Sequence, residues 1–118
     1  MSTTSYRRGD VVLGLFPDSN LKTAKRRPVL IIQADNLATG IPQWIVAMIS
    51  SNMARVGHSS RIEVLLSTAE GQASGLQTDT VIMTDNLATI LEKELDRVIG
   101  VWTNMAAVDG ALRITLGL

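Results

Sequence analysis

The apolar residues of this 118-residue chain fall into short runs that are separated by glycine, proline, asparagine and serine. Runs of about four to eight apolar and β-branched residues between such turn formers are typical of β-strands. Short strands at regular spacing favour a small β-barrel or a sandwich. The pattern predicts strands over residues 10–16, 28–33, 43–49, 61–66, 80–83 and 97–102.

The spacing of the apolar positions changes near the C-terminus. One face of a helix would carry Met105, Val108, Leu112 and Leu116, with Thr103 as its N-cap. Gly110 would weaken that helix by up to about 1 kcal/mol. We also expect a single helical turn within residues 91–96. The chain is thus predicted to be mainly β with a C-terminal helix.

A polar segment over residues 17–27 has no apolar periodicity and is predicted to be a loop. It is long for a connection between two strands, and long connections in small domains are often functional. It ends in a group of basic residues, namely Lys22, Lys25, Arg26 and Arg27. The strand that follows is nearly continuous in apolar residues, which predicts burial on both faces.

The composition fits one domain and offers few cofactor sites. A chain of 118 residues has room for a single core, so we expect one domain over residues 1–118. The sequence has no cysteine, one histidine and no glycine-rich phosphate-binding motif, so we expect neither a metal nor another cofactor. Its first ten residues lack the apolar stretch that is typical of a signal peptide, and no apolar run approaches the roughly 20 residues that span a bilayer. We therefore expect a cytoplasmic protein without a membrane partner.

The charges are unevenly distributed although the formal net charge is zero. Residues 1–62 carry a net charge of +5 and residues 63–118 a net charge of −5. Such asymmetry is compatible with a basic face that binds a polyanion. Solvated surface charge without a partner is the alternative interpretation.

Arg27 is the basic residue whose position is most informative. It precedes Pro28, which keeps its backbone extended at the start of a buried strand. A guanidinium held there matches phosphate oxygens and can stabilise charge that develops on a phosphorane. A solvated basic loop with surface ion pairs remains open as the alternative. His58, between Gly57 and Ser59, is more typical of a solvated loop histidine than of a catalytic base.

Several short motifs, taken in order, are similar to those of one known family. They are GDVV at residues 9–12, FP at 16–17, RRPVLII at 26–32 and ISS at 49–51. The order and the residues resemble the opening strand, basic loop, RP-aliphatic strand and Ser/Thr-ended strand of the MazF/PemK toxins. The GL pair at 75–76, VI at 81–82, Asp85, TI at 89–90 and VIG at 98–100 look like the second half of that family.

The resemblance implies an SH3-like small β-barrel that forms a homodimer. It implies an endoribonuclease toxin of a type II toxin–antitoxin system, which cleaves single-stranded RNA without metal by attack of the 2′-hydroxyl on the adjacent phosphate. It also implies a small acidic antitoxin as partner. Residue by residue, Arg27 matches the family's catalytic arginine, Ser50 its hydroxyl residue and Asp85 the acidic residue of some PemK-like members.

The sequence departs from such members at two positions. Met83 stands where they have an arginine, and the first loop lacks their histidine. We therefore assign transition-state charge and leaving-group protonation to Arg27, and we expect Asp85 to accept the 2′-hydroxyl proton if it is partly desolvated. The candidate RNA-binding residues are Lys22, Lys25, Arg26, Ser51, Arg55 and His58.

Two other functions are compatible with the same sequence. One is a barrel that binds RNA or antitoxin but has lost catalysis, an alternative that the methionine at position 83 keeps open. The other is a structural adaptor that binds a protein through its edge strands, in which case the basic loop would be incidental.

Overall fold

The computed structural model describes residues 6–118. Its strands are β1 (Asp10–Pro17), β2 (Ala24–Ile31), β3 (Gln43–Ser50), β4 (Arg61–Val64), β5 (Thr80–Leu91) and β6 (Leu95–Val101). The helices are α1 (Ala69–Ala73) and α2 (Met105–Leu116), with 3₁₀ turns η1 (Met53–Arg55) and η2 (Glu92–Glu94). No helix in this described part of the chain is long and apolar enough to span a membrane.

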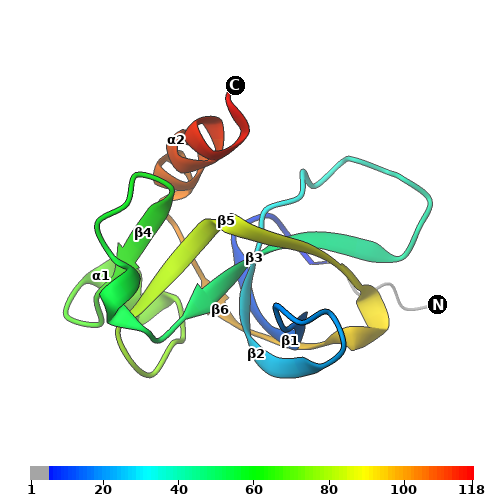
Figure 1. Cartoon of the computed structure of the whole chain (residues 1–118), viewed down its shortest axis with the longest axis horizontal. Helices are drawn as coiled ribbons and strands as arrows, with labels where there is room; N and C mark the ends of the chain where they lie inside the picture. Colours follow the sequence, from blue (N-terminus) through cyan, green and yellow to red (C-terminus); the bar gives the residue numbers. More distant parts are fainter. Residues whose placement is uncertain (1–5) are drawn as a thin grey trace.

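The strands form one antiparallel sheet in the order β4-β5-β3-β2-β1-β6. The sheet is strongly curved, and the C-terminal helix α2 lies outside it near β4 and β5 (Figure 1). The edge strands β4 and β6 are not paired with each other among the described residues, so the barrel is open. The predicted mainly β fold with a C-terminal helix is confirmed.

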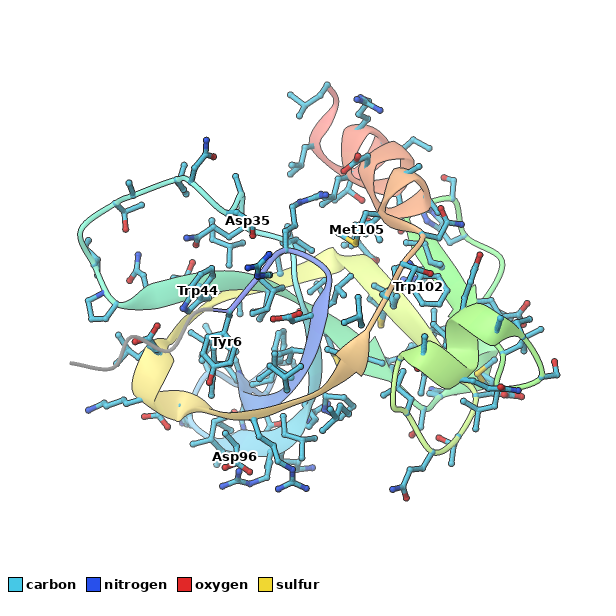
Figure 2. The ribbon with its side chains drawn as sticks, turned by 180° about the vertical axis from the view of Figure 1, so that it is seen from behind. Tyr6, Asp35, Trp44, Asp96, Trp102 and Met105 are labelled. Carbon is cyan, nitrogen blue, oxygen red and sulfur yellow. The ribbon has the colours of Figure 1, made fainter. Side chains whose placement is uncertain are left out.

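The core lies on both faces of the sheet because successive side chains of a strand point to opposite sides. Val12, Val29 and Val46 belong to the cluster inside the curved sheet, where Tyr6 packs edge-to-face on Trp44 with ring centroids 5.8 Å apart (Figure 2). The cluster on the other face contains apolar residues of β1 to β5 and of α2 together with Trp102, namely Val11, Leu30, Ala47, Ile49, Val64, Ile82, Trp102 and Val108, and Ile99 of β6 packs against it. Residues 29–31 are fully buried, as predicted for this strand.

The predicted loop over residues 17–27 is too long. Pro17 ends β1 and residues 24–27 already belong to β2, so the loop covers residues 18–23 only. Residues 24–27 pair with β1, for example Lys25 with Phe16. The ladder uses backbone groups, and three of these four side chains are charged, so the apolar pattern did not show this part of the strand.

The other boundary errors have local causes. The strand predicted over 80–83 continues to Leu91, because a bulge interrupts its alternation. Asn104, rather than Thr103, caps α2, since its side chain accepts from the Ala107 N–H. The helix α1 was not predicted, because its five residues are too few for a helical period. The expected turn within residues 91–96 is confirmed as η2.

Candidate functional site

A polar cavity of about 470 Å³ opens where the 18–23 loop faces the sheet. We call it the front pocket. It combines the loop with residues of β2, β3, β5 and η1, which are far apart in the sequence. Its lining residues are Pro17, Asp18, Ser19, Asn20, Thr23, Lys25, Arg27, Met48, Arg55 and Asn86.

Arg27 lies at the point where β2 leaves the apolar core. It is two residues before the buried Val29 and therefore on the same face of the strand. Its Nη2 donates to Asp18 Oδ1 over 3.1 Å, and its side chain is 23% exposed. Its Nε is buried and has no hydrogen-bond partner among residues 6–118. Such an unsatisfied donor is costly and rare, which marks a place for an acceptor that binds there.

The loop holds Asp18 in a fixed position against this guanidinium. The Thr23 hydroxyl donates to Asp18 Oδ2 over 2.6 Å, so both carboxylate oxygens are engaged. Asn20 Oδ1 accepts from the backbone N–H groups of Lys22 and Thr23, which closes the turn. Asp18 was not predicted as a site residue, because one acidic residue near four basic ones is typical of ordinary surface charge.

Arg55 brings a second guanidinium to the front pocket from η1. This turn begins where the Asn52 side chain accepts from the Ala54 N–H. Arg55 Nη1 lies 3.4 Å from Met83 Sδ, a weak contact. The pocket thus gains an arginine from a different element, close to Met83. Lys25 completes its basic lining.

A bulge in β5 supplies the remaining polar wall. Met48 pairs with Met83 while Ala47 pairs with Leu87, so β5 contains three residues with no counterpart in β3. The middle of these is Asp85, and the third, Asn86, lines the front pocket with its Nδ2 3.0 Å from the Met48 sulfur. Asn86 was not predicted as a site residue, and its only signal was a group of three polar residues, 84–86, between two apolar runs.

Asp85 lies outside the lining of the front pocket. Arg61 of β4 donates to both of its oxygens, from Nη2 over 2.8 Å and from Nε over 3.3 Å. This hydrogen bonding is the main reason that the pKa of Asp85 is lowered, although burial acts in the opposite direction. A carboxylate with a lowered pKa is ionised at neutral pH but is a weak base. Its assigned role as proton acceptor stays a prediction.

Ser50 and Ser51 face different surroundings. Ser50 is buried, its Oγ accepts from the Asn52 N–H over 3.1 Å, and it does not line the front pocket. The register that pairs Val29 with Met48 places Ser50 on the same sheet face as Arg27. Ser51 is exposed and lines a separate cavity. The structure therefore does not bring the two hydroxyls together.

The other predicted binding residues are spread more widely. His58 is exposed in a turn, where its Nδ1 lies 2.7 Å from Ser60 Oγ, as expected for a loop histidine. Lys22 is exposed on the 18–23 loop. Arg26 points away from the front pocket to Asp96, which is labelled in Figure 2, at 2.9 Å. Among residues 6–118, no group of three or more His, Asp or Glu side chains is placed to hold a metal ion.

Comparison with known proteins places the chain in a family. A family model for the PemK-like, MazF-like toxin of type II toxin–antitoxin systems matches residues 7–116. The Endoribonuclease MazF of Staphylococcus epidermidis is 33% identical over 115 residues, which cover 95% of this chain and 92% of that protein.

Solved structures with the same fold have lower sequence identity. Mycobacterium tuberculosis toxin MazF-mt6 gives a TM-score of 0.72 at 22% identity, covering 92% of this chain and 97% of that chain. An endoribonuclease in complex with its cognate antitoxin, from mycobacterial species, gives 0.73 at 19% identity, covering 96% of both chains. These likenesses confirm the barrel-like fold that the sequence resemblance implied. The chain belongs to the PemK-like, MazF-like toxin family of type II toxin–antitoxin systems.

Proposed function

We propose that this chain is an endoribonuclease toxin that cleaves single-stranded RNA by attack of a 2′-hydroxyl on the adjacent phosphate. The observation that carries the proposal is the Arg27 guanidinium, fixed by Asp18 and with a buried Nε that lacks a partner within the described chain. Lys25 and Arg55 line the same pocket and would attract the phosphate backbone. The Staphylococcus epidermidis relative, named an endoribonuclease, supports this assignment.

The charged and amide side chains of the front pocket have separate roles in this reaction. Arg27 donates to the non-bridging oxygens as negative charge develops and protonates the leaving 5′-oxygen. Arg55 and Lys25 hold the adjacent phosphates, and the Asn86 amide is placed to contact the strand. A phosphate that enters would take the place of Asp18 on Arg27, since both are anions that compete for the same donors.

The lining of the front pocket favours a different proton acceptor from the one that the sequence predicted. Asp18 lines the pocket in contact with Arg27, whereas Asp85 is held by Arg61 outside the lining. Once a phosphate displaces it from Arg27, the Asp18 carboxylate lies beside the reacting atoms. We therefore assign acceptance of the 2′-hydroxyl proton to Asp18. Asp85 is instead assigned a positioning role, because it holds Arg61, which also donates to the Arg55 carbonyl.

Cleavage of single-stranded RNA by the purified chain in excess EDTA tests this function. We expect products with 2′,3′-cyclic phosphate and 5′-hydroxyl ends. Arg27→Lys and Arg27→Ala should both abolish cleavage while the circular dichroism spectrum and melting temperature stay close to wild type, because lysine keeps the charge but loses the planar fork. Near-normal activity of Arg27→Lys would show that a point charge suffices. RNA binding without cleavage by the wild type would support the inactive barrel instead.

We further propose that the toxin is a cytoplasmic homodimer inhibited by a small acidic antitoxin. The antitoxin complex of the mycobacterial neighbour supports such a partner. A small open barrel with 46% apolar residues supports self-association about a two-fold axis. Light scattering at micromolar concentration should give twice the chain mass. A fully active monomer would contradict the dimer.

A further inference from the structure

A second cavity, of about 310 Å³, lies behind Arg27 on the other face of the sheet. We call it the rear pocket. Pro28 follows Arg27 along β2 and lines the rear pocket, whereas Arg27 lines the front pocket. Leu13 is paired with Pro28 on one side and with Arg97 on the other, so a row of rear-pocket residues crosses three strands. The full lining is Leu13, Pro28, Ser51, Gly75, Leu76, Gln77, Thr78, Thr80, Arg97 and Ile99.

The two pockets flank a split in the sheet. The ladder between β2 and β3 ends at the pair of Val29 and Met48. Before this point β2 pairs only with β1, and after it β3 pairs only with β5. Arg27 and Pro28, in β2, therefore lie on one side of the split. Ser51, which directly follows β3, lies on the other side. A single extended strand that crosses this end of the sheet would contact both pockets.

Thr80 lines the rear pocket and carries a buried hydroxyl without a partner among the described residues. The residue is 4% exposed. Other buried hydroxyls behave differently, since Thr84 donates to the Ser60 carbonyl and Ser74 to the Gly71 carbonyl. Because buried hydroxyls are nearly always bonded, the Thr80 hydroxyl is available to a ligand that reaches it.

The charge and walls of the rear pocket suit a nucleotide. Arg97 is the only charged residue among its described lining residues, and its contact with Asp96 is long at 3.4 Å. Apolar walls come from Leu13, Leu76 and Ile99, which can cover the face of a base. The volume is at the lower end of small-molecule sites, as suits one base with its sugar. Single-stranded RNA is recognised through such unstacked bases.

We propose that the rear pocket binds one unstacked nucleotide of the RNA strand whose scissile phosphate lies at Arg27. The base packs against the apolar walls, the Thr80 hydroxyl bonds to its edge, and Arg97 binds its phosphate. This inference rests on the proposed ribonuclease function. It assigns part of the sequence preference of cleavage to residues on the face of the sheet opposite the catalytic arginine.

Titration of the full chain with the four nucleoside 5′-monophosphates and with ribose 5-phosphate tests the site without requiring cleavage. Backbone amide shifts of residues 75–80 should follow the titration and should favour one or two bases. Thr80→Val should weaken the preferred nucleotide about two- to tenfold, the effect of one lost hydrogen bond. Arg97→Gln should weaken all four nucleotides alike. Thr89→Val is the matched control, an exposed threonine of the same strand outside both pockets.

Each other result overturns the proposal in a different way. Equal binding of ribose 5-phosphate would show that the pocket does not bind a base. If the nucleotides leave the amide shifts of residues 75–80 unchanged, or if only the antitoxin changes them, the rear pocket is not a nucleotide site. If the chain cleaves RNA but Thr80→Val keeps the wild-type sequence preference, the pocket is not on the substrate path although the function stands. If nucleotides bind with base preference but RNA is not cleaved, the proposed function fails and the nucleotide site remains.

Discussion

Asp18 is the residue on which the proposed chemistry of the front pocket depends most directly. Its two oxygens are divided between Arg27 and Thr23, at 3.1 and 2.6 Å. We expect Asp18→Asn to keep the contact with Arg27, because the amide oxygen still accepts, but to remove the basic oxygen. If Asp18 accepts the 2′-hydroxyl proton, the kcat should fall by about 10²- to 10⁴-fold, the usual contribution of a general base.

Asp85→Asn is the matched variant for this prediction. It removes a carboxylate that lies outside the pocket lining and is held by Arg61, so we expect the kcat to stay within about tenfold of wild type. Single-turnover cleavage of the two variants, with the kcat measured across pH, decides between them. A larger loss in Asp85→Asn than in Asp18→Asn would return the proton to Asp85, as the family resemblance implied.

At the residue scale, the sequence predicted the cationic part of the site better than the rest. Lys25 and Arg27 were predicted because clustered positive charge and the arginine–proline step can be recognised in the sequence, and the structure brings both to one pocket together with Arg55. Lys22 and Arg26 of the same cluster do not line it. Asp18 and Asn86 could not be predicted in this way. Their importance comes from a turn and a bulge that place them against residues distant in the sequence.

At the scale of elements, the packing of β6 on the α1 segment depends on glycine. A Cβ at Gly100 would lie 2.2 Å from the backbone carbonyl of Ser74, and backbone cannot move aside as a side chain can. We expect Gly100→Ala to destabilise the fold by at least about 1–3 kcal/mol, the usual cost of overpacking. Urea denaturation of the variant and the wild type measures the change.

Gly110 provides the control for the same substitution. It lies within α2, and a Cβ there would meet nothing within 4 Å. Because alanine is the better helix former, Gly110→Ala should stabilise the fold by about 0.5–1 kcal/mol. Destabilisation by Gly110→Ala, or an unchanged midpoint in Gly100→Ala, would contradict this account of the packing.

For the strands and α2, the boundaries were harder to predict from the sequence than the presence of each element. The apolar pattern indicated each of the strands and α2, since burial of a periodic face is what forms them. It could not show that residues 24–27 extend β2, because those residues are held by backbone pairing to β1. Nor could it follow β5 through its bulge, where three residues break the alternation.

At the scale of the whole molecule, the net charge is zero, but the basic and acidic residues are unevenly distributed. The front pocket contains Lys25, Arg27 and Arg55 and a single acidic lining residue, Asp18. Acidic residues of the second half are partly used in ion pairs with basic residues elsewhere, such as Asp109 with Arg8 and Asp96 with Arg26. The pairing leaves the pocket as a basic surface on a neutral protein, and an acidic partner would be attracted to it.

The acidic partner, the proposed antitoxin, should bind over the front pocket. A flexible acidic and apolar segment that covers the front pocket would compete directly with RNA for Arg27, Lys25 and Arg55. We expect its binding to block RNA binding and to protect the amides of the 18–23 loop from hydrogen exchange. The association rate should fall as salt rises, because salt screens the long-range attraction between opposite charges.

The dissociation rate should depend less on salt than the association rate, because buried apolar contacts hold the complex once it has formed. Stopped-flow association and displacement measurements between low and high ionic strength give both rates. Amide hydrogen exchange at residues 29–31 is the internal control. These residues are fully buried in the core, so the antitoxin should not change their protection. A complex that still binds RNA with unchanged affinity, or that leaves residues 18–23 unprotected, would show that antitoxin and RNA use separate surfaces, even if the ribonuclease function stands.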